Sequence, residues 1–129
     1  QAGKYVETGR VFLASATALS DVADEDAPYG NAIALLAIHA AISYSDALSI
    51  AYGGIKSTDD HAKAVDALRS VLGAQLLIAR AKELLKIRLE KDAVSYQGSY
   101  YTLEEGQRIL AVAESYCAWA RRMFEGRPA

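Results

Sequence analysis

The sequence predicts an all-α protein, with one domain over residues 1–129 built as an antiparallel bundle of four long helices and one short helix. Apolar residues recur at helical spacing along most of the chain, as in helices that bury one face. No stretch of useful length alternates apolar and polar residues as a strand would. The two prolines, Pro28 and Pro128, lie where neither interrupts a helix.

The first two predicted helices cover residues 4–22 and 31–52. The acidic segment Asp21–Asp26 comes just before Pro28, and acidic residues followed by proline suit the first turn of a helix. The pair Gly53–Gly54 is a strong signal for the end of the second helix. The expected apolar positions of the first helix are Tyr5, Phe12, Ala16, Leu19 and Val22.

The third predicted helix is short. Ser57 or Thr58 can cap its first turn, its apolar stripe ends at Leu72, and Gly73 either ends it or marks a bend. The fourth helix covers residues 74–93 and turns Leu77, Leu84 and Ile87 toward the core. Its outer face is expected to be basic, formed by Arg80, Lys82, Lys86, Arg88 and Lys91.

The fifth helix opens with a capping box, Thr102 to Glu105, and closes before Gly126. In a capping box the two side chains each accept a hydrogen bond from the other residue's backbone, which fixes where the helix starts. One face of this helix carries its apolar residues, which are Ile109, Val112, Tyr116, Trp119 and Met123.

Composition limits the function classes. The net charge of −2 lacks the excess of cations on which non-specific nucleic-acid binding depends, so contact with RNA or a nucleotide would use a local patch. Cys117 is the single cysteine and cannot form an internal disulfide, which fits a cytoplasmic location. No secretory leader and no apolar run long enough to span a bilayer is recognised, so we expect no membrane contact.

Polar residues follow one face of the second helix. His39, Ser43 and Asp46 are spaced at i, i+4 and i+7, which places them on the same side of an otherwise apolar segment. The favoured interpretation is structural, because one histidine and one aspartate can tie a buried helix to its neighbours through hydrogen bonds. The alternative is that His39 belongs to a working site.

A second candidate lies where the third helix begins. Lys56 precedes His61 by five residues, and a cation that holds phosphate beside an imidazole that moves a proton is a sensible pair for cleaving RNA. The candidate catalytic residues are therefore His61, Lys56 and His39. The plainer interpretation, which we favour, is that His61 is an ordinary first-turn residue beside Asp59 and Asp60.

The end of the fourth helix and the loop after it form a candidate ligand-binding surface. Cations on the helix could hold a phosphate while a tyrosine ring stacks on a base. The alternative is that the tyrosines pack the end of the bundle and the cations are solvated. A phenol is a poor base at neutral pH, so this surface favours binding over catalysis. The candidate residues are Arg88, Lys91, Tyr96, Tyr100 and Tyr101.

Metals and cofactors are not expected. The chain has two histidines and one cysteine, and nothing in it matches a zinc or EF-hand pattern. Gly53–Gly54 lacks the rest of a phosphate-binding P-loop. The serines have no nucleophile-elbow context.

Four segments carry a resemblance to a known family. They are "HAAISYSDAL" on the second helix, "DDHAKAVDAL" on the third, "LLKIRLEKDAVSY" on the fourth and "TLEEGQRILAVAESYCAWA" on the last. In this order the chain resembles the HEPN superfamily of small helical-bundle domains, over about Asn31 to Arg121. The resemblance rests on this pattern of helices.

The resemblance implies a homodimer. It also implies either a metal-independent ribonuclease of toxin–antitoxin or defence systems, or a relative without activity that binds nucleotides, RNA or proteins. Active members carry an arginine, four to six residues, and then a histidine just before the last helix. That motif falls here on Lys91 to Tyr96, so that lysine replaces arginine and tyrosine replaces histidine. Lysine lacks the guanidinium fork, and tyrosine does not move protons at neutral pH, so the departures argue against activity.

The sequence therefore favours a non-catalytic HEPN-like homodimer that binds a nucleotide, RNA or a protein partner. Its dimer would form a composite cleft lined by the fourth helix and the tyrosine loop. One alternative is a divergent metal-independent ribonuclease, in which His61 or His39 moves the proton and Lys56 or Lys91 holds the phosphate. Another is an immunity or antitoxin-like module that docks a basic protein through the acidic segment Asp21–Asp26.

Overall fold

The computed structural model describes residues 1–25, 27–54, 61–95 and 98–127, with the backbone alone for residues 61 and 62. These residues form five α-helices and one short 3₁₀ turn, Gly73–Gln75, and no strand occurs among them. The predicted all-α class is therefore confirmed, with four long helices and one short one. The helices are α1 (Ala2–Val22), α2 (Tyr29–Gly53), α3 (His61–Leu72), α4 (Ile78–Ser95) and α5 (Leu103–Glu125).

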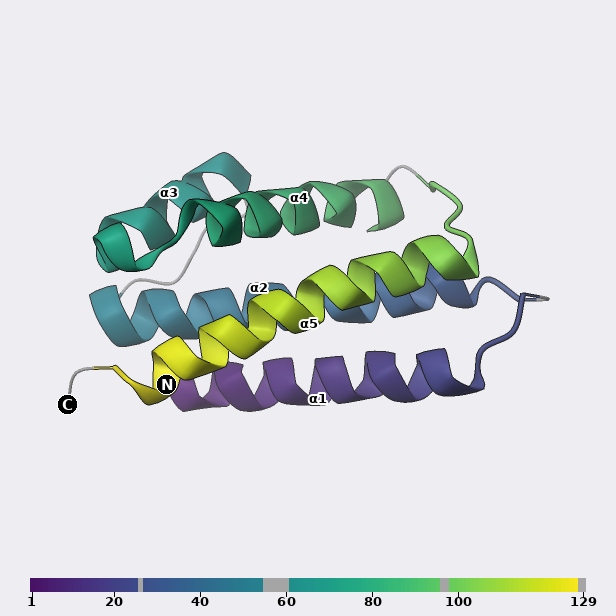
Figure 1. Cartoon of the computed structure of the whole chain (residues 1–129), viewed down its shortest axis with the longest axis horizontal. Coiled ribbons are helices and arrows are strands. Elements are labelled where there is room, and N and C mark those ends of the chain that lie inside the picture. Colours follow the sequence, from purple (N-terminus) through teal and green to yellow (C-terminus); the bar gives the residue numbers. More distant parts are fainter. Residues whose placement is uncertain (26, 55–60, 96–97, 128–129) are drawn as a thin grey trace.

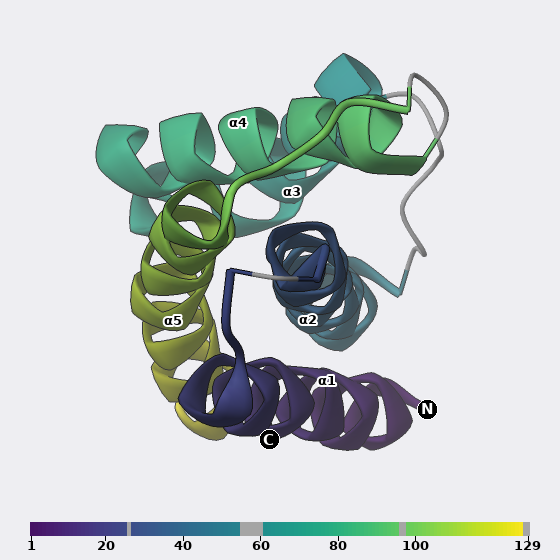
Figure 2. The ribbon, with the colours of Figure 1, turned by 90° about the vertical axis from the view of Figure 1, so that its right-hand side faces the viewer.

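Helix α2 lies at the centre and contacts each of the other four helices (Figures 1 and 2). Its closest neighbours are α1 and α5, while α1 and α4 lie on opposite sides of the α2–α5 pair. Helices α1 and α4 run opposite to α2 and α5, as Figure 1 shows. The molecule is thus an up-down bundle in which one diagonal pair, α2 and α5, is in direct contact.

The central position of α2 explains why it is apolar on every side. Its buried residues include Ile33, Ile38 and Leu48, which are fully enclosed by neighbouring helices. By length and composition alone, α2 is also long and apolar enough to cross a membrane, contrary to the expectation from sequence. However, 67% of its most apolar window is buried inside the bundle, and a core helix passes the same test.

Helix ends follow the predicted signals with small shifts. Gly54 adopts the left-handed conformation (φ 69°) and donates its N–H to the carbonyls of Ile50 and Ser49, which ends α2. Thr102 and Glu105 form the predicted capping box at the start of α5. Helix α4 starts at Ile78, because Gly73, also left-handed at φ 57°, ends α3 and a 3₁₀ turn intervenes.

The first turns of α2 and α5 approach very closely. A Cβ atom added to Gly106 on α5 would lie 2.7 Å from the Cα atom of Gly30 on α2, which is closer than real side chains come. Only glycine on both helices permits this approach. The crossing fixes residues 98–102 of the tyrosine loop (residues 94–102) against the start of α2.

Some predicted core positions are wrong. Val22 at the end of α1 and Leu77 before α4 are 71% and 55% exposed, although helical spacing assigned both to the core. Val22 lies on the last turn of α1, and Leu77 precedes α4 in the turn that leads into it. The predicted apolar positions of α3 and α4 are otherwise confirmed: Val65, Leu68 and Leu72 on α3 are buried, as are Leu84 and Ile87 on α4.

Candidate functional site

The three polar residues predicted on one face of α2, which are His39, Ser43 and Asp46, lie in different surroundings. The His39 ring is half-buried and lies against the Phe12 ring of α1, with centroids 5.6 Å apart and planes tilted by 30°. Burial lowers the pKa of His39 below its ordinary 6.5, and the positive charge of Lys91 on α4 lowers this pKa further. His39 therefore tends to be a neutral imidazole near a lysine.

Ser43 and Asp46 differ in depth. Ser43 is half-buried, whereas Asp46 is 7% exposed and is not left without a partner. A buried, partnered carboxylate is the arrangement that a structural role requires. That role for His39, Ser43 and Asp46 stays a prediction.

Ser45, which the sequence analysis did not single out, is more deeply buried on α2 than Ser43. Ser45 donates to the Ala41 carbonyl oxygen at 2.8 Å and shares a 2.7 Å hydrogen bond with the Tyr116 hydroxyl of α5. Tyr116 is fully buried, and burial raises its pKa far above the ordinary value. Helical spacing predicts Tyr116 on the apolar face of α5, and a tyrosine at such a position signals that its hydroxyl needs a buried polar partner.

The side chains of Lys56 and His61, the pair expected at the start of the third helix, lie outside the described part of the chain. Lys56 is not among the described residues, and His61 is described as the first residue of α3 without its side chain. Tyr96 is also outside the described residues. The catalytic role of Lys56 and His61 and the binding role of Tyr96 remain predictions.

The prediction that Arg88 lies on the outer face of the fourth helix is wrong. Its side chain is 2% exposed, it follows the fully buried Ile87, and it is not left without a partner. Arg88 lies seven residues after the buried Ala81 and four after Leu84, so helical spacing puts it on the core stripe. Lys91, one turn further on, is half-buried near His39.

Asn31 at the start of α2 holds the tyrosine loop. Its side-chain nitrogen donates to the Ser99 carbonyl at 2.7 Å, and its side-chain oxygen accepts from the Tyr101 backbone N–H at 2.9 Å. Tyr101 is 8% exposed, and its hydroxyl donates to a carboxylate oxygen of Glu90 on α4. Tyr101 therefore packs the end of the bundle, as one of the two interpretations expected.

Tyr100, in contrast to Tyr101, is exposed to solvent. Its side chain is 67% exposed, although the residues on either side are held in place by Asn31. It lies at the edge of a cavity of about 360 Å³ between α4, α5 and the loop, here called the tyrosine cleft. The cleft is lined by Lys86, Glu90, Ser99, Tyr100, Tyr101, Glu105, Arg108, Ile109 and Val112.

The polar side chains of the tyrosine cleft differ in how firmly they are held. Glu90 accepts from Tyr101, and Glu105 accepts from the backbone N–H of Thr102 at 3.0 Å, which lowers the pKa of Glu105. Arg108 pairs with Glu104 on the exposed surface of α5, and such pairs are readily exchanged. Lys86 is exposed and forms no ion pair with a described residue. The cleft thus offers two available cations beside an exposed ring.

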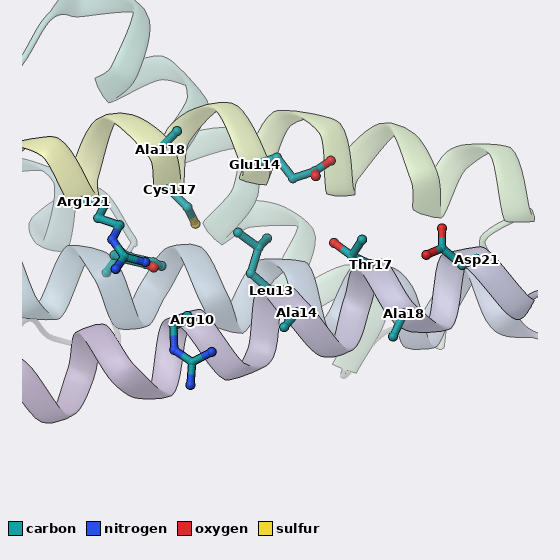
Figure 3. Close-up of a pocket in the computed structure, with 11 residues that line it drawn as sticks. Arg10, Leu13, Ala14, Thr17, Ala18, Asp21, Glu114, Cys117, Ala118 and Arg121 are labelled. Carbon is teal, nitrogen blue, oxygen red and sulfur yellow. The ribbon is translucent and has the colours of Figure 1, made fainter.

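A second hollow lies between α1 and α5, with α2 as its floor. This α1–α5 groove has a volume of about 500 Å³, and Figure 3 shows its lining residues. Small side chains line much of it, Ala14 and Ala18 from α1 and Cys117 and Ala118 from α5, and Thr17 and Glu114 lie on the same middle stretch. Burial raises the pKa of the Cys117 thiol to about 12, so this sulfur is a packing group and not a nucleophile.

Comparison with known proteins adds no relative. No family model matches the chain, no curated protein matches it, and no solved structure matches it. Within the part of the chain that the structure describes, no three histidine, cysteine, aspartate or glutamate side chains are grouped so as to hold a metal ion. Function must therefore be argued from the two hollows and from the His39 environment.

Proposed function

We propose that this chain is a non-catalytic, HEPN-like domain that binds a nucleotide or the end of a single-stranded RNA in the tyrosine cleft. The observation that carries the proposal is the exposed Tyr100 ring beside Lys86 and Arg108 in a cavity of nucleotide size. The loop that presents the ring is clamped by Asn31, so little ordering remains to be done when a base stacks on it.

The chemistry of the cleft divides between the two ends of a nucleotide. A base would stack on Tyr100, because every base has a π-face and stacking tolerates any sequence. The phosphate would lie against Lys86 and Arg108, the latter giving up its exposed pairing with Glu104. Glu90 and Glu105 on the wall can accept hydrogen bonds from ribose hydroxyls or base amino groups, which favours a nucleotide over a bare phosphate.

Fluorescence anisotropy with a labelled single-stranded RNA octamer tests the proposal. Tyr100→Ala should weaken binding by about tenfold, since one stacked base contributes about 1–3 kcal/mol. Lys86→Glu should weaken it at least as much and flatten its salt dependence. Lys82→Glu is the matched control, because Lys82 is exposed one turn earlier on α4, makes the same charge change and does not line the cleft.

Two results would contradict the proposal. One is an octamer that does not bind the wild type at low salt. The other is binding that Lys82→Glu weakens as much as Lys86→Glu, because general charge and not the cleft would then be responsible.

The second candidate function is a divergent metal-independent ribonuclease, favoured by the environment of His39. Burial and, to a smaller extent, the Lys91 charge lower the pKa of this imidazole, so it is neutral at pH 7 and able to accept a proton. Lys91 would hold the scissile phosphate. Helices α2 and α4 are in contact, which brings the two residues to one side of the bundle.

An RNA-cleavage assay in the presence of a chelator separates the two functions. The ribonuclease requires cleavage that His39→Ala and Lys91→Ala each abolish, while Lys82→Ala leaves it unchanged. If wild type and all three variants leave the RNA intact, this second candidate is removed and binding without cutting remains.

A further inference from the structure

Tyr100 borders a second cavity besides the tyrosine cleft. This cavity, here called the acidic pocket, has a volume of about 360 Å³ and lies at the end of the bundle where α1 ends and α5 begins (Figure 1). Tyr100 belongs to both linings, so a base stacked on its exposed ring can reach polar groups on either side. The residues that line the acidic pocket are Glu25, Ala27, Tyr100, Thr102, Leu103 and Glu104.

The two cavities differ in charge. The acidic pocket has two exposed carboxylates, Glu25 and Glu104, and no cation among the described residues lines it. A phosphate is repelled from these carboxylates and attracted to Lys86 and Arg108 in the tyrosine cleft. Donor groups of a base are favoured beside carboxylates, which only accept hydrogen bonds. A nucleotide on Tyr100 is therefore oriented with its phosphate in the cleft and its base toward the acidic pocket.

One ion pair connects the two cavities. Arg108, which lines the cleft, donates to Glu104, which lines the acidic pocket, at 2.6 Å between Nη2 and Oε1. Both side chains are exposed, so the pair contributes little and is readily exchanged. A phosphate that takes Arg108 leaves the Glu104 carboxylate free to accept from the base. Glu90 and Glu105 on the cleft wall, in contrast, are already held by the hydrogen bonds described above.

We propose that the site selects guanine, with both oxygens of the Glu104 carboxylate accepting hydrogen bonds from the base while Arg108 and Lys86 hold the phosphate. This inference rests on the proposed function, which is nucleotide binding in the tyrosine cleft. Guanine presents two adjacent donors on its Watson–Crick edge, N1–H and the 2-amino group, and they match the two oxygens of one carboxylate. Adenine and cytosine place their amino group beside an accepting ring nitrogen, and uracil has one N–H between two carbonyls, so none of them offers this pair.

Competition between 5′-mononucleotides and a labelled uridine octamer, measured by fluorescence anisotropy, tests the selection. GMP should displace the octamer at a concentration at least about tenfold lower than AMP, CMP or UMP, because a bidentate pair discriminates between bases by about this factor or more. IMP differs from GMP only in lacking the 2-amino group, and it should lose most of the advantage.

Glu104→Gln should abolish the preference for GMP over IMP and AMP. The amide keeps one accepting oxygen, but its N–H group opposes one of the two guanine donors. The variant should also bind the uridine octamer more tightly than the wild type does, because Arg108 no longer has a carboxylate partner to give up. Glu125→Gln is the matched control and should change neither result: Glu125 is also an exposed carboxylate of α5 paired with an arginine one turn away, and it lines neither cavity.

The possible failures are distinguishable. If the octamer binds but GMP competes no better than AMP and IMP, guanine selection is overturned and the proposed function stands. If GMP is preferred and Glu104→Gln keeps that preference, the role of Glu104 is overturned. If the octamer does not bind the wild type at low salt, the proposed function itself is contradicted and this inference fails with it.

Discussion

At the scale of single residues, the structure explains why an apolar helix carries an imidazole. His39 lies against Phe12 of α1 and within reach of the charge of Lys91 on α4, so it lies where three helices meet. Its ring packs against Phe12, and because the side chain is half-buried, part of it stays in contact with water. This placement fits a packing role for His39 and also the proton transfer of the second candidate function. Titration of the ring and the RNA-cleavage assay distinguish the two roles.

The lowered pKa of His39 makes stability depend on pH in a defined direction. Well above pH 6.5 the ring is neutral in the folded and unfolded chains and contributes no pH dependence. As the pH falls below 6.5, the unfolded chain takes up the proton first, so the free energy of unfolding decreases until the folded-state pKa is passed. Urea unfolding between pH 7 and pH 5 should show a smaller loss for His39→Gln than for the wild type.

NMR titration of the His39 ring checks the cause. Lys91→Gln should raise the pKa of His39, because one of its two causes is removed, while the burial remains. An unchanged pKa in that variant would mean that the lysine charge does not reach the ring.

The hydrogen bond between Ser45 and Tyr116 makes a second prediction at this scale. Ser45→Ala leaves the fully buried Tyr116 hydroxyl without its partner and should cost about 1–3 kcal/mol of unfolding free energy. Tyr116→Phe should cost less, because Ser45 keeps its bond to the Ala41 carbonyl. In the double variant the two losses should not add, and strict additivity in urea unfolding would show that the two side chains are not coupled.

At the scale of the helices, the α2–α5 crossing determines where the tyrosine loop lies. Gly106→Ala would force the first turns of the two helices apart and should cost about 1–3 kcal/mol. Gly3→Ala on α1 is the matched control, because its added Cβ meets nothing within 4 Å, and it should leave stability unchanged or slightly higher. Thermal unfolding of both variants is the measurement, and equal melting temperatures would contradict the close crossing.

Helix α4 shows which buried positions helical spacing predicts correctly and where the sequence-based assignment fails. Spacing predicted that Leu84 and Ile87 face the core, and the same spacing places Arg88 there, yet its charge led to the opposite assignment. Leu89 is 55% exposed although it is apolar. In a helix that contacts α2, α3 and α5, the position of a residue along the helix decides its burial more than its charge does.

The tyrosine loop shows what periodicity cannot predict. Tyr100 and Tyr101 are adjacent and identical, but one is exposed and the other is buried. The difference comes from Asn31, about seventy residues earlier in the chain, which accepts from the Tyr101 backbone N–H. Helix positions and the capping box follow from local sequence, whereas this part of the candidate site depends on a contact between distant segments.

At the scale of the whole molecule, the tyrosine cleft and the α1–α5 groove use different parts of α5. The tyrosine cleft takes Glu105 to Val112 near its start, and the α1–α5 groove takes Glu114 to Arg121 further along. A molecule in the groove would therefore leave the tyrosine cleft open. We expect Ala18→Gln in the groove to leave the affinity of the chain for the RNA octamer unchanged, because Ala18 does not line the tyrosine cleft.

The most direct test of the tyrosine cleft is an NMR titration of the ¹⁵N-labelled protein with the unlabelled RNA octamer. We predict that the backbone amides of Ser99, Tyr100 and Arg108 shift most, and that those of Ala14 and Ala18 in the α1–α5 groove do not respond. Shifts confined to the groove, or no shifts at low salt, would contradict binding in the cleft.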